Sequence, residues 1–429
     1  MTPYPEYKAT KLPWLPQIPA HWELVKIREL FTERNQKVSD KEYAPLSVSK
    51  GGVVPQISTV AKTDNGDNRK LVKVGDFVIN SRSDRKGSSG ISAYDGSVSL
   101  INLVLKPRND YNRGYLHYLL KSIPFIEEYY KNGHGIVADL WTTRYSEMKT
   151  ISIPTPTAAE QEQIVRYLDS TTSEINKLIR AKKKQIALLQ EQKQAIINQA
   201  VTKGLNPNAE MKDSGIDWLG QIPAHWEVKK AKYCVNINHG SDPVTEGNVP
   251  VYGSGAGSFK TCGEFKEGPA VLVGRKGATL HIPHYITGKY WNVDTAFDVK
   301  AKKNFFLHFY YFLATCFDYH FYISQTTLPS MTQTDYLNMK LPVPPQKEQY
   351  DIIQFLVMQD EKFDNLIAEI KNIINSLFEY KNSLIACVVT GQVDVRNIQV
   401  EDFDPADLIS ETDDDPAEDD DQPQEESEE

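Results

Sequence analysis

The chain contains two copies of one sequence pattern, and this duplication constrains the fold more than any other feature. The ten residues Trp-Leu-Pro-Gln-Ile-Pro-Ala-His-Trp-Glu at 14–23, here named the opening motif, recur at 218–227 with one substitution. A second pattern, Pro-x-Pro-x-x-x-Glu-Gln, begins at 154 and again at 342, and the similarity continues without a gap to Val201-Thr202 and Val389-Thr390. Each half therefore has a near-constant start, a variable middle and a near-constant end.

The near-constant ends predict two long helices. Thr157 and Glu160 are spaced as a capping box at the start of the first. Gly204 and Gly391 stand where a helix C-terminal cap is expected. One apolar stripe on each helix predicts that the two helices pack against each other. Three- and four-residue spacing defines the stripes, at 164, 168, 175, 178, 186, 189, 196 and 200 in the first helix and at 352, 356, 363, 366, 370, 374, 377, 385 and 388 in the second.

Two long amphipathic helices can belong to an ordinary core, but their duplication favours an antiparallel coiled coil with pseudo-two-fold symmetry. The variable middles carry short β-rich runs, such as Ala270–Val273, and one helical patch each. We therefore expect a mixed α/β (α+β) fold in which two globular domains alternate with two long helices.

The repeats also predict domain boundaries. In chain order we expect an N-terminal start (1–23), a first globular domain (24–153), a first helix (154–203), a connector with the second opening motif (204–227), a second globular domain (228–341), a second helix (342–392) and a C-terminal segment with a disordered acidic tail (393–429).

The charge is unevenly distributed along the chain. With 48 Lys and Arg against 57 Asp and Glu the net charge is −9, which by itself argues against a nucleic-acid partner. Residues 401–429, however, hold 16 acidic and no basic residues, so residues 1–400 have a net charge of +7. The variable middles carry this excess, +6 in 24–153 and +4 in 228–341. That distribution is typical of two modules that contact nucleic acid.

One loop in each middle combines glycine with basic side chains. Gly75–Arg82 aligns with Gly268–Arg275 at an offset of 193 residues, as a turn glycine, an apolar strand and an arginine. Glycine lets a backbone approach a phosphate closely, arginine can bind guanine, and lysine or hydroxyl groups can bind phosphate. A solvated basic turn is the alternative for any one residue. The candidate DNA contacts are Arg82, Arg85, Lys86, Ser88, Arg275, Lys276 and Thr279.

The polar stretch before each long helix, 141–145 and 324–333, is a second candidate because its side chains can hydrogen-bond base edges. Ordinary loop polarity is the alternative interpretation. The candidate contacts in these stretches are Arg144, Gln325 and Gln333.

Patterns of other chemistry are weaker. Residues 253–257, Gly-Ser-Gly-Ala-Gly, resemble a phosphate loop, but the Walker pattern is absent and a flexible turn is favoured. Asp242 upstream of Glu264-Phe-Lys266 is similar to a nuclease carboxylate set, yet the same acid-x-Lys triplet occurs on a long helix. No established metal site has the spacing of the four possible ligands Cys262, His281, His284 and His308. No glycine-rich S-adenosylmethionine loop is present, so we expect no catalytic residue, cofactor or metal.

The cysteines and the apolar runs predict the compartment. The four cysteines are too far apart for a CxxC pair or a dense disulfide framework, which fits a reducing environment. The first residues lack the order of a signal peptide, and no apolar run approaches about 18 residues. We expect a soluble, cytoplasmic protein with no membrane contact.

The doubled opening motif, the doubled Pro-x-Pro-x-x-x-Glu-Gln helix start and the endings that begin Val-Thr resemble the DNA-specificity subunit of type I restriction-modification systems. The resemblance covers most of the chain. It implies two target-recognition domains that each read one half of a bipartite double-stranded DNA site, with helices that set the spacing. It also implies two methyltransferase (modification) subunits docked on the helices, which methylate adenine N6, and ATP-dependent restriction (translocase) subunits bound through them. The chain itself would be a non-catalytic subunit.

The chain departs from this pattern at Pro13 and Pro16, where the second copy has Asp217 and Gly220, and in the acidic tail. Two other functions fit parts of the sequence: a coiled-coil scaffold that does not bind DNA, and a stand-alone nuclease or methyltransferase. The basic middles argue against the first, and the missing motifs argue against the second. A further hypothesis is that the tail lies against the basic recognition surfaces and suppresses non-specific binding.

Overall fold

The computed structural model describes residues 2–56, 66–108, 111–135, 141–255, 257–319, 329–404 and 408. The chain divides into two compact units: unit 1 comprises residues 1–182 and 372–429, and unit 2 comprises residues 183–371. Each of the two long helices, α5 (Ala158–Lys203) and α8 (Gln346–Val389), starts in one unit and ends in the other. No helix in the described residues combines the length and the apolar run that a membrane span needs.

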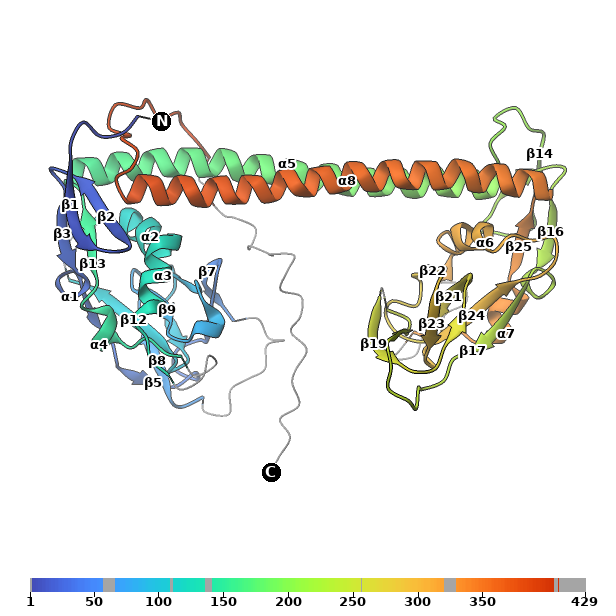
Figure 1. The fold of residues 1–429 in the computed structure, drawn as a ribbon, viewed down its shortest axis with the longest axis horizontal. Coiled ribbons are helices and arrows are strands. Elements are labelled where there is room, and N and C mark those ends of the chain that lie inside the picture. The colour runs from blue at the N-terminus through green and yellow to red at the C-terminus, as the bar shows by residue number, and fades with distance from the viewer. Residues whose placement is uncertain are drawn as a thin grey trace. The chain divides into compact units, whose positions relative to one another are not determined.

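Unit 1 is organised around the short strand β9 (Phe77–Asn80), which is buried on both faces. Phe77 and Ile79 pack in a cluster with the helices α2 (Arg113–Lys121) and α3 (Ile123–Lys131), whereas Val78 packs in a second cluster on the opposite face. This alternation follows from the two-residue period of a strand. The central sheet has the order β10 (Ser89–Ile91), β9, β12 (Asn102–Pro107) and β4 (Phe31–Glu33). Figure 1 shows β9 and β12 beside α3.

The elements of unit 1 before α5 are the strands β1 (Tyr7–Leu12), β2 (Leu15–Pro19), β3 (Glu23–Lys26), β4 (Phe31–Glu33), β5 (Lys37–Val38), β6 (Leu46–Ser49), β7 (Gly52–Pro55), β8 (Arg69–Val72), β10 (Ser89–Ile91), β11 (Gly96–Val98), β12 (Asn102–Pro107) and β13 (Ser152–Thr155), and the helices α1 (Ile27–Leu30), η1 (Ser83–Arg85), α2 (Arg113–Lys121), α3 (Ile123–Lys131) and α4 (Tyr145–Met148). Smaller sheets are β11-β8-β5 and the pairs β1-β2, β6-β7 and β13-β3.

Unit 2 repeats this plan around β21 (Ala270–Gly274) in a sheet of order β17-β24-β21-β22, with a second sheet of order β19-β18-β23-β20. Its other elements are β14 (Met211–Asp213), β15 (Gln221–Pro223), β16 (Glu227–Lys230), η3 (Ala231–Tyr233), β17 (Val235–His239), β18 (Val249–Tyr252), β19 (Ser258–Cys262), β20 (Lys266–Glu267), β22 (His284–Ile286), β23 (Lys289–Asn292), β24 (Ala296–Ala301), α6 (Leu307–Ala314), α7 (Gln333–Asn338) and β25 (Lys340–Val343).

Within each unit the start of one long helix packs against the end of the other. In unit 1, Ile164 of α5 shares a buried cluster with Leu384 and Val388 of α8. In unit 2, Val201 of α5 shares a cluster with Ile352 of α8. The predicted antiparallel pairing and the mixed α/β class with an internal repeat are therefore confirmed.

The packed stripe differs from the predicted one most clearly at one level of each helix. Leu178 is 44% and Leu366 is 38% exposed, whereas the adjacent Ile179 and Ile367 are 5% and 9% exposed. Both members of each Leu-Ile pair fit a three- and four-residue spacing. The helix advances 3.6 residues per turn rather than 3.5, so only the packing selects which member is buried.

Three repeated motifs meet in unit 1. Trp22 of the opening motif is buried, and Nε2 of its neighbour His21 lies 2.9 Å from Oε2 of Glu160 at the start of α5. A Cβ atom added to Gly391, just after α8, would lie 3.0 Å from the Trp22 ring. Gly391 has a φ of +77°, which glycine adopts readily at a helix C-terminus. The opening motif thus contacts the start of one helix and the end of the other.

The same motifs meet in unit 2. His225 Nε2 and Trp226 Nε1 lie 2.6 and 2.7 Å from the carboxylate of Glu348 at the start of α8. A Cβ atom on Gly204, just after α5, would lie 3.1 Å from Trp226. The duplicated sequence therefore specifies a duplicated joint between three segments, which accounts for its near-identity in the two halves.

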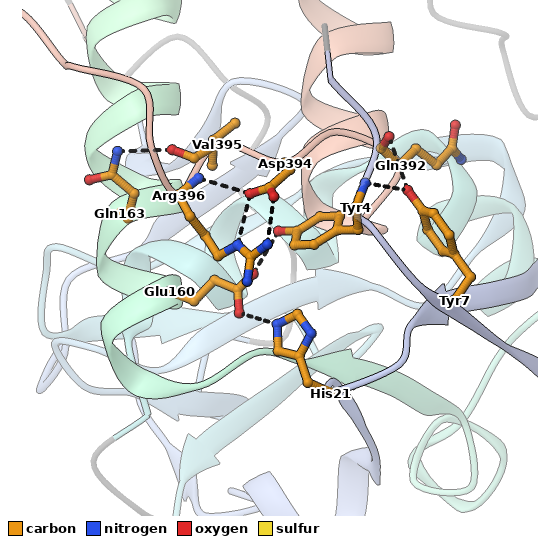
Figure 2. Close-up of polar contacts among 9 residues, drawn as sticks. All are labelled: Tyr4, Tyr7, His21, Glu160, Gln163, Gln392, Asp394, Val395 and Arg396. Atoms are coloured by element: carbon orange, nitrogen blue, oxygen red, sulfur yellow. Dashed lines mark hydrogen bonds and ion pairs between the residues drawn. The ribbon is translucent and has the colours of Figure 1, made fainter.

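Glu160 does not form the predicted capping box, because its carboxylate is engaged elsewhere. Oε1 accepts a hydrogen bond of 2.6 Å from Tyr4 Oη, while Oε2 binds His21 (Figure 2). In unit 2 the tryptophan of the opening motif, Trp226, donates to Glu348. In unit 1 the equivalent Trp22 Nε1 has no hydrogen-bond partner among the described residues, and Tyr4 donates to Glu160 instead. This is how the N-terminal copy of the joint differs from the second.

Residues after α8 complete the joint of unit 1. The Arg396 guanidinium lies over the Tyr4 ring, 5.0 Å from its centroid, and donates two hydrogen bonds of 2.9 and 2.7 Å to Asp394 (Figure 2). Arg396 holds the pKa of Asp394 below its usual value. The Asp394 N–H donates to the Thr2 carbonyl, and Gln163 donates to Val395. Residues 2–4 and 394–398 are therefore held together at the start of α5.

Candidate nucleic-acid interface

The basic loop of unit 1, residues 82–88, begins where β9 ends. β10 pairs with β9 and starts at Ser89, so the loop is shorter than the sequence indicated. Arg82, Arg85 and Lys86 are exposed on it. Lys86 Nζ lies 2.7 Å from Glu127 Oε1, with both side chains largely in solvent. An exposed ion pair of this kind contributes little free energy, so a phosphate can replace the carboxylate.

The stretch before the long helix, 141–144, lies beside this loop. The Ser83 N–H donates to the Trp141 carbonyl at 3.2 Å, and the Thr143 N–H donates to the Ser81 carbonyl at 3.0 Å. Arg82 and Thr142 are opposite each other in an isolated bridge. The two candidate stretches of the first domain, distant in sequence, therefore form one surface.

Buried tyrosines of α3 fix this pair of stretches. Tyr130 Oη donates to the Asn80 carbonyl at 2.8 Å, at the end of β9, and Tyr129 Oη donates to the Thr143 carbonyl at 3.0 Å. Burial raises the pKa of both hydroxyls, so they remain donors. The exposed cations thus extend from a rigid base.

Unit 2 has the same construction at the end of β21, where residues 275–280 form its basic loop. The Met331 N–H donates to the Arg275 carbonyl at 2.8 Å, and the Gly277 N–H donates to the Pro329 carbonyl at 3.0 Å. Lys276 and Ser330 form an isolated bridge. A buried tyrosine again holds the strand end, since Tyr336 Oη donates to the Gly274 carbonyl at 2.8 Å.

One carboxylate is shared by the two cations of this loop. Asp294 Oδ2 lies 3.3 Å from Arg275 Nη1 and 3.1 Å from Lys276 Nζ. All three side chains are about 40% exposed, at 39, 39 and 45%. The carboxylate orients two cations toward one point, as a phosphate oxygen would.

The structure corrects the alignment of the two loops by one residue. Phe77 and Ile79 face the helix-side cluster of unit 1, and Val271 and Val273 face that of unit 2, so the offset is 194 rather than 193. The isolated bridges support the offset of 194. Arg82 and Lys276 each bridge to the stretch that precedes the long helix, so Arg82 occupies the position of Lys276 and not that of Arg275. A slip of one residue places a side chain on the opposite face of a strand. Arg275 corresponds to Ser81, which is 5% exposed.

Some candidate residues are poorly placed to contact DNA. Ser88 is 6% exposed, and its carbonyl accepts from the Asn80 N–H. Gln333 is half-buried, and its amide donates to the Ile237 carbonyl. Thr279 is half-buried and Arg144 is exposed. Gln325 lies outside the described residues.

The residues considered for other chemistry have structural partners. Lys266 Nζ binds Asn292 at 2.7 Å and lies 3.4 Å from the buried Asp298. Glu264 accepts from the Val244 and Thr245 N–H groups, which lowers its pKa to about 2. His308 stacks on Tyr285 with centroids 4.2 Å apart. Nowhere in the described part of the chain do three or more His, Cys, Asp or Glu side chains gather as a metal site would require.

Sequence reasoning missed the hairpin of β18 and β19 in unit 2. The glycines of residues 253–257 predict a flexible turn at its tip. In the structure Ser254 of this turn lies against Gly277 of the basic loop, since a Cβ atom on Gly277 would lie 3.0 Å from Ser254 Oγ. The φ of Gly277 is +115°. The glycines of the two loops were visible in sequence, but their contact was not.

Comparison with known protein families identifies the family of this chain. The type I restriction modification DNA specificity domain family matches residues 19–188 and 223–377, once in each half of the chain. The chain belongs to this family. The proposed resemblance is thus confirmed: the chain is a type I specificity subunit, a class of protein that recognises a DNA sequence.

Individual relatives agree with the assignment. The type I restriction enzyme MjaVIII specificity subunit of Methanocaldococcus jannaschii is 27% identical over 233 residues, which cover 52% of this specificity subunit and 51% of that protein. The chain thus spans about half the length of that relative. A provisionally named MjaX specificity subunit of the same organism is 23% identical over 433 residues, covering 89% of this chain and 95% of that one.

A solved structure shares the fold. A chain from a study of the complex assembly and conformational transition of the type I R-M system superposes with a TM-score of 0.64 at 14% identity, over 88% of this specificity subunit and 99% of that chain. At this identity the likeness supports the fold alone.

Proposed function

We propose that this specificity subunit binds double-stranded DNA through the basic loops of its two units, and that each unit reads one half of a bipartite site. One observation carries the proposal: in both units exposed cations stand at the end of the buried central strand, beside the stretch that precedes the long helix, although the two loop sequences differ. Function-bearing side chains on a conserved scaffold are expected to vary when two modules read different sequences.

The proposed contacts are fewer than the sequence suggested. In unit 1 they are Arg82, Arg85 and Lys86, with Arg144 at the edge. In unit 2 they are Arg275 and Lys276. Ser88 is left out because it is buried, and Gln333 because its amide is engaged. Arginine is the side chain best suited to bind guanine, and either cation can bind phosphate.

The test uses the chain assembled with its modification subunits. Mapping N6-methyladenine in cells with and without this chain would identify the recognised sequence, and a duplex carrying it would serve as the probe. Replacing Arg275 and Lys276 together by alanine is expected to weaken binding and to reduce the slope of log K against log salt by about 2, because each phosphate contact contributes about 0.9.

Matched controls are available on the same sheets. Lys303 follows β24, at the end of that strand remote from Asp294, and Lys106 lies near the corresponding end of β12; both are exposed. Alanine at these positions should leave the salt slope unchanged. Equal effects of loop and control variants would contradict the assignment of the interface to the loops.

We infer further that two modification subunits dock on the long helices and connect the specificity subunit to restriction subunits. In unit 2 Met358 and Leu366 of α8 are 59% and 38% exposed. They line one shallow hollow with charged and amide side chains, namely Glu361, Lys362, Asn365 and Glu369. Exposed apolar side chains with a polar rim are typical of protein interfaces.

Docking can be tested by co-purification. Met358→Glu is expected to reduce recovery of the modification subunit, whereas Gln354→Glu places the same charge about one turn earlier at an exposed position and should not. Catalysis is then assigned to the partners. Purified specificity subunit alone should neither methylate nor cut the probe; activity of the isolated chain would contradict this assignment.

A further inference from the structure

The hairpin of β18 and β19 carries a β-bulge at Phe259. Tyr252 lies opposite Ser258 and Val251 lies opposite Lys260, so Phe259 is the extra residue between two paired positions. A bulge redirects a side chain out of the regular alternation of the strand. The Phe259 side chain is 58% exposed. The backbone irregularity therefore presents an aromatic ring to solvent.

Neighbouring residues give this ring a polar, cationic surrounding. β19 is at the edge of its sheet, and Ser258 to Thr261 are exposed while Cys262 is buried. Lys260 Nζ lies 5.5 Å from the centroid of the Phe259 ring. An exposed phenyl ring contributes little to folding, and beside a cation it suits a ligand that offers both a flat face and a negative charge.

The ring lies next to the basic loop of unit 2. A Cβ atom on Gly253 would be 3.7 Å from Cε1 of Phe259 and 2.8 Å from Thr295 Oγ1. The Thr295 carbonyl accepts from the Arg275 N–H at 2.8 Å. Phe259, Lys260 and the cations of the basic loop therefore form one continuous surface.

We propose that Phe259 is a wedge that inserts at a base step of the bound duplex, with Lys260 on the adjacent phosphate. This inference rests on the proposed DNA-binding function and adds a second kind of contact to it. Apolar side chains that enter a base step unstack it and bend the duplex, and the sequence dependence of that deformation contributes to specificity. The wedge is thus a specificity-determining residue distinct from the cations.

The wedge is confined to one unit among the described residues. The corresponding hairpin of unit 1, β6 and β7, pairs in unbroken register from Leu46 opposite Pro55 to Ser49 opposite Gly52. No aromatic residue lies in that hairpin. Distortion is therefore expected in one half of the bipartite site and not in the other.

The test uses the full chain assembled with its modification subunits on a duplex that carries the methylation-mapped site. Potassium permanganate reports unstacked thymines, and 2-aminopurine substituted along each half-site reports unstacked purines. The intact complex should show enhanced reactivity or fluorescence at one step of one half-site. Phe259→Ala should abolish that signal and weaken binding by about tenfold, within the range of base–aromatic stacking.

Phe265→Ala is the matched control. Phe265 is 51% exposed, and Lys289 Nζ lies 4.2 Å from its ring centroid, but it precedes β20 at the opposite edge of the same sheet. This variant should retain the signal. Phe259→Trp should retain it also, because the indole can stack. Thermal unfolding of Phe259→Ala should match that of the intact chain.

The outcomes separate this inference from the proposed function. If Arg275→Ala/Lys276→Ala weakens binding while Phe259→Ala binds and distorts DNA normally, the wedge is refuted and the DNA interface stands. If neither variant alters binding, both are refuted. Loss of the modification subunit on purification of Phe259→Ala would also overturn the wedge, because the ring would then belong to a protein interface.

Discussion

Replacing Glu160 by alanine is expected to destabilise unit 1. The side chain is nearly buried, and its two oxygens bind Tyr4 at 2.6 Å and His21 at 2.9 Å. A hydrogen bond to a charged group contributes about 1.5–3 kcal/mol. The His21 side chain is 40% exposed, so its share is below about 1 kcal/mol. We expect a loss of about 3 kcal/mol, because the Tyr4 hydroxyl also loses its acceptor.

The second copy of the joint provides the comparison. The Glu348 and His225 side chains are 38% and 50% exposed, so Glu348→Ala should cost about 1–2 kcal/mol, mainly through the bond from Trp226. Glu162→Ala, at an exposed position of α5, should cost less than about 0.5 kcal/mol. Urea unfolding gives these free energies, and hydrogen exchange shows which unit loosens.

A double-mutant cycle isolates the central contact. Tyr4→Phe and Glu160→Ala should couple by about 1–2 kcal/mol, since the first removes the donor and the second the acceptor of the same hydrogen bond. The reasoning would be wrong if Glu160→Ala unfolded like Glu162→Ala, or if its increased exchange appeared in unit 2 instead of at residues 2–23 and the start of α5.

Three further predictions concern charge. Asp294→Asn should tighten non-specific DNA binding at low salt, because the two cations of the basic loop lose their internal partner; titration with an unrelated duplex would show this, and weaker binding would contradict it. Glu264, with its lowered pKa of about 2, accepts hydrogen bonds from the Val244 and Thr245 N–H groups in the loop before β18. Its stabilisation of this loop should be complete above about pH 4.5 and be lost as the pH falls toward about 2. Exchange of the two amides that it accepts from should follow this dependence, and Glu264→Gln should remove it. Deleting 401–429 should tighten binding to unrelated DNA at low salt if the tail competes for the basic loops, whereas unchanged affinity would limit it to a solubility role.

Much of the fold follows from sequence because its determinants are local. The spacing of apolar residues from Ile164 to Ala200 specifies a long helix, and a repeat of this length specifies a second one. The net positive charge of the two middles predicted that they are the DNA-contacting modules. In contrast, Leu178 and Ile179 satisfy the same spacing, and their burial depends on the partner helix.

The residues of the candidate site could be predicted from the sequence only in part. Exposed arginines and lysines near glycine could be selected by residue type. Arg82 and Thr142, however, are 60 residues apart in sequence, and only the sheet and α3 bring them together. The bulge at Phe259 left no sequence signal, because it arises from how two strands pair.

The sequence by itself determined the repeat, the two long helices and the position of the positive charge, since each depends on residue identity and on spacing along the chain. The tertiary structure decided which residues those features bring into contact. It paired Glu160 with Tyr4 rather than with the helix N-terminus, and it shifted the alignment of the basic loops so that Arg82 corresponds to Lys276. Strand register and long-range hydrogen bonds are set by the packing of distant segments, so these contacts had to come from the folded chain.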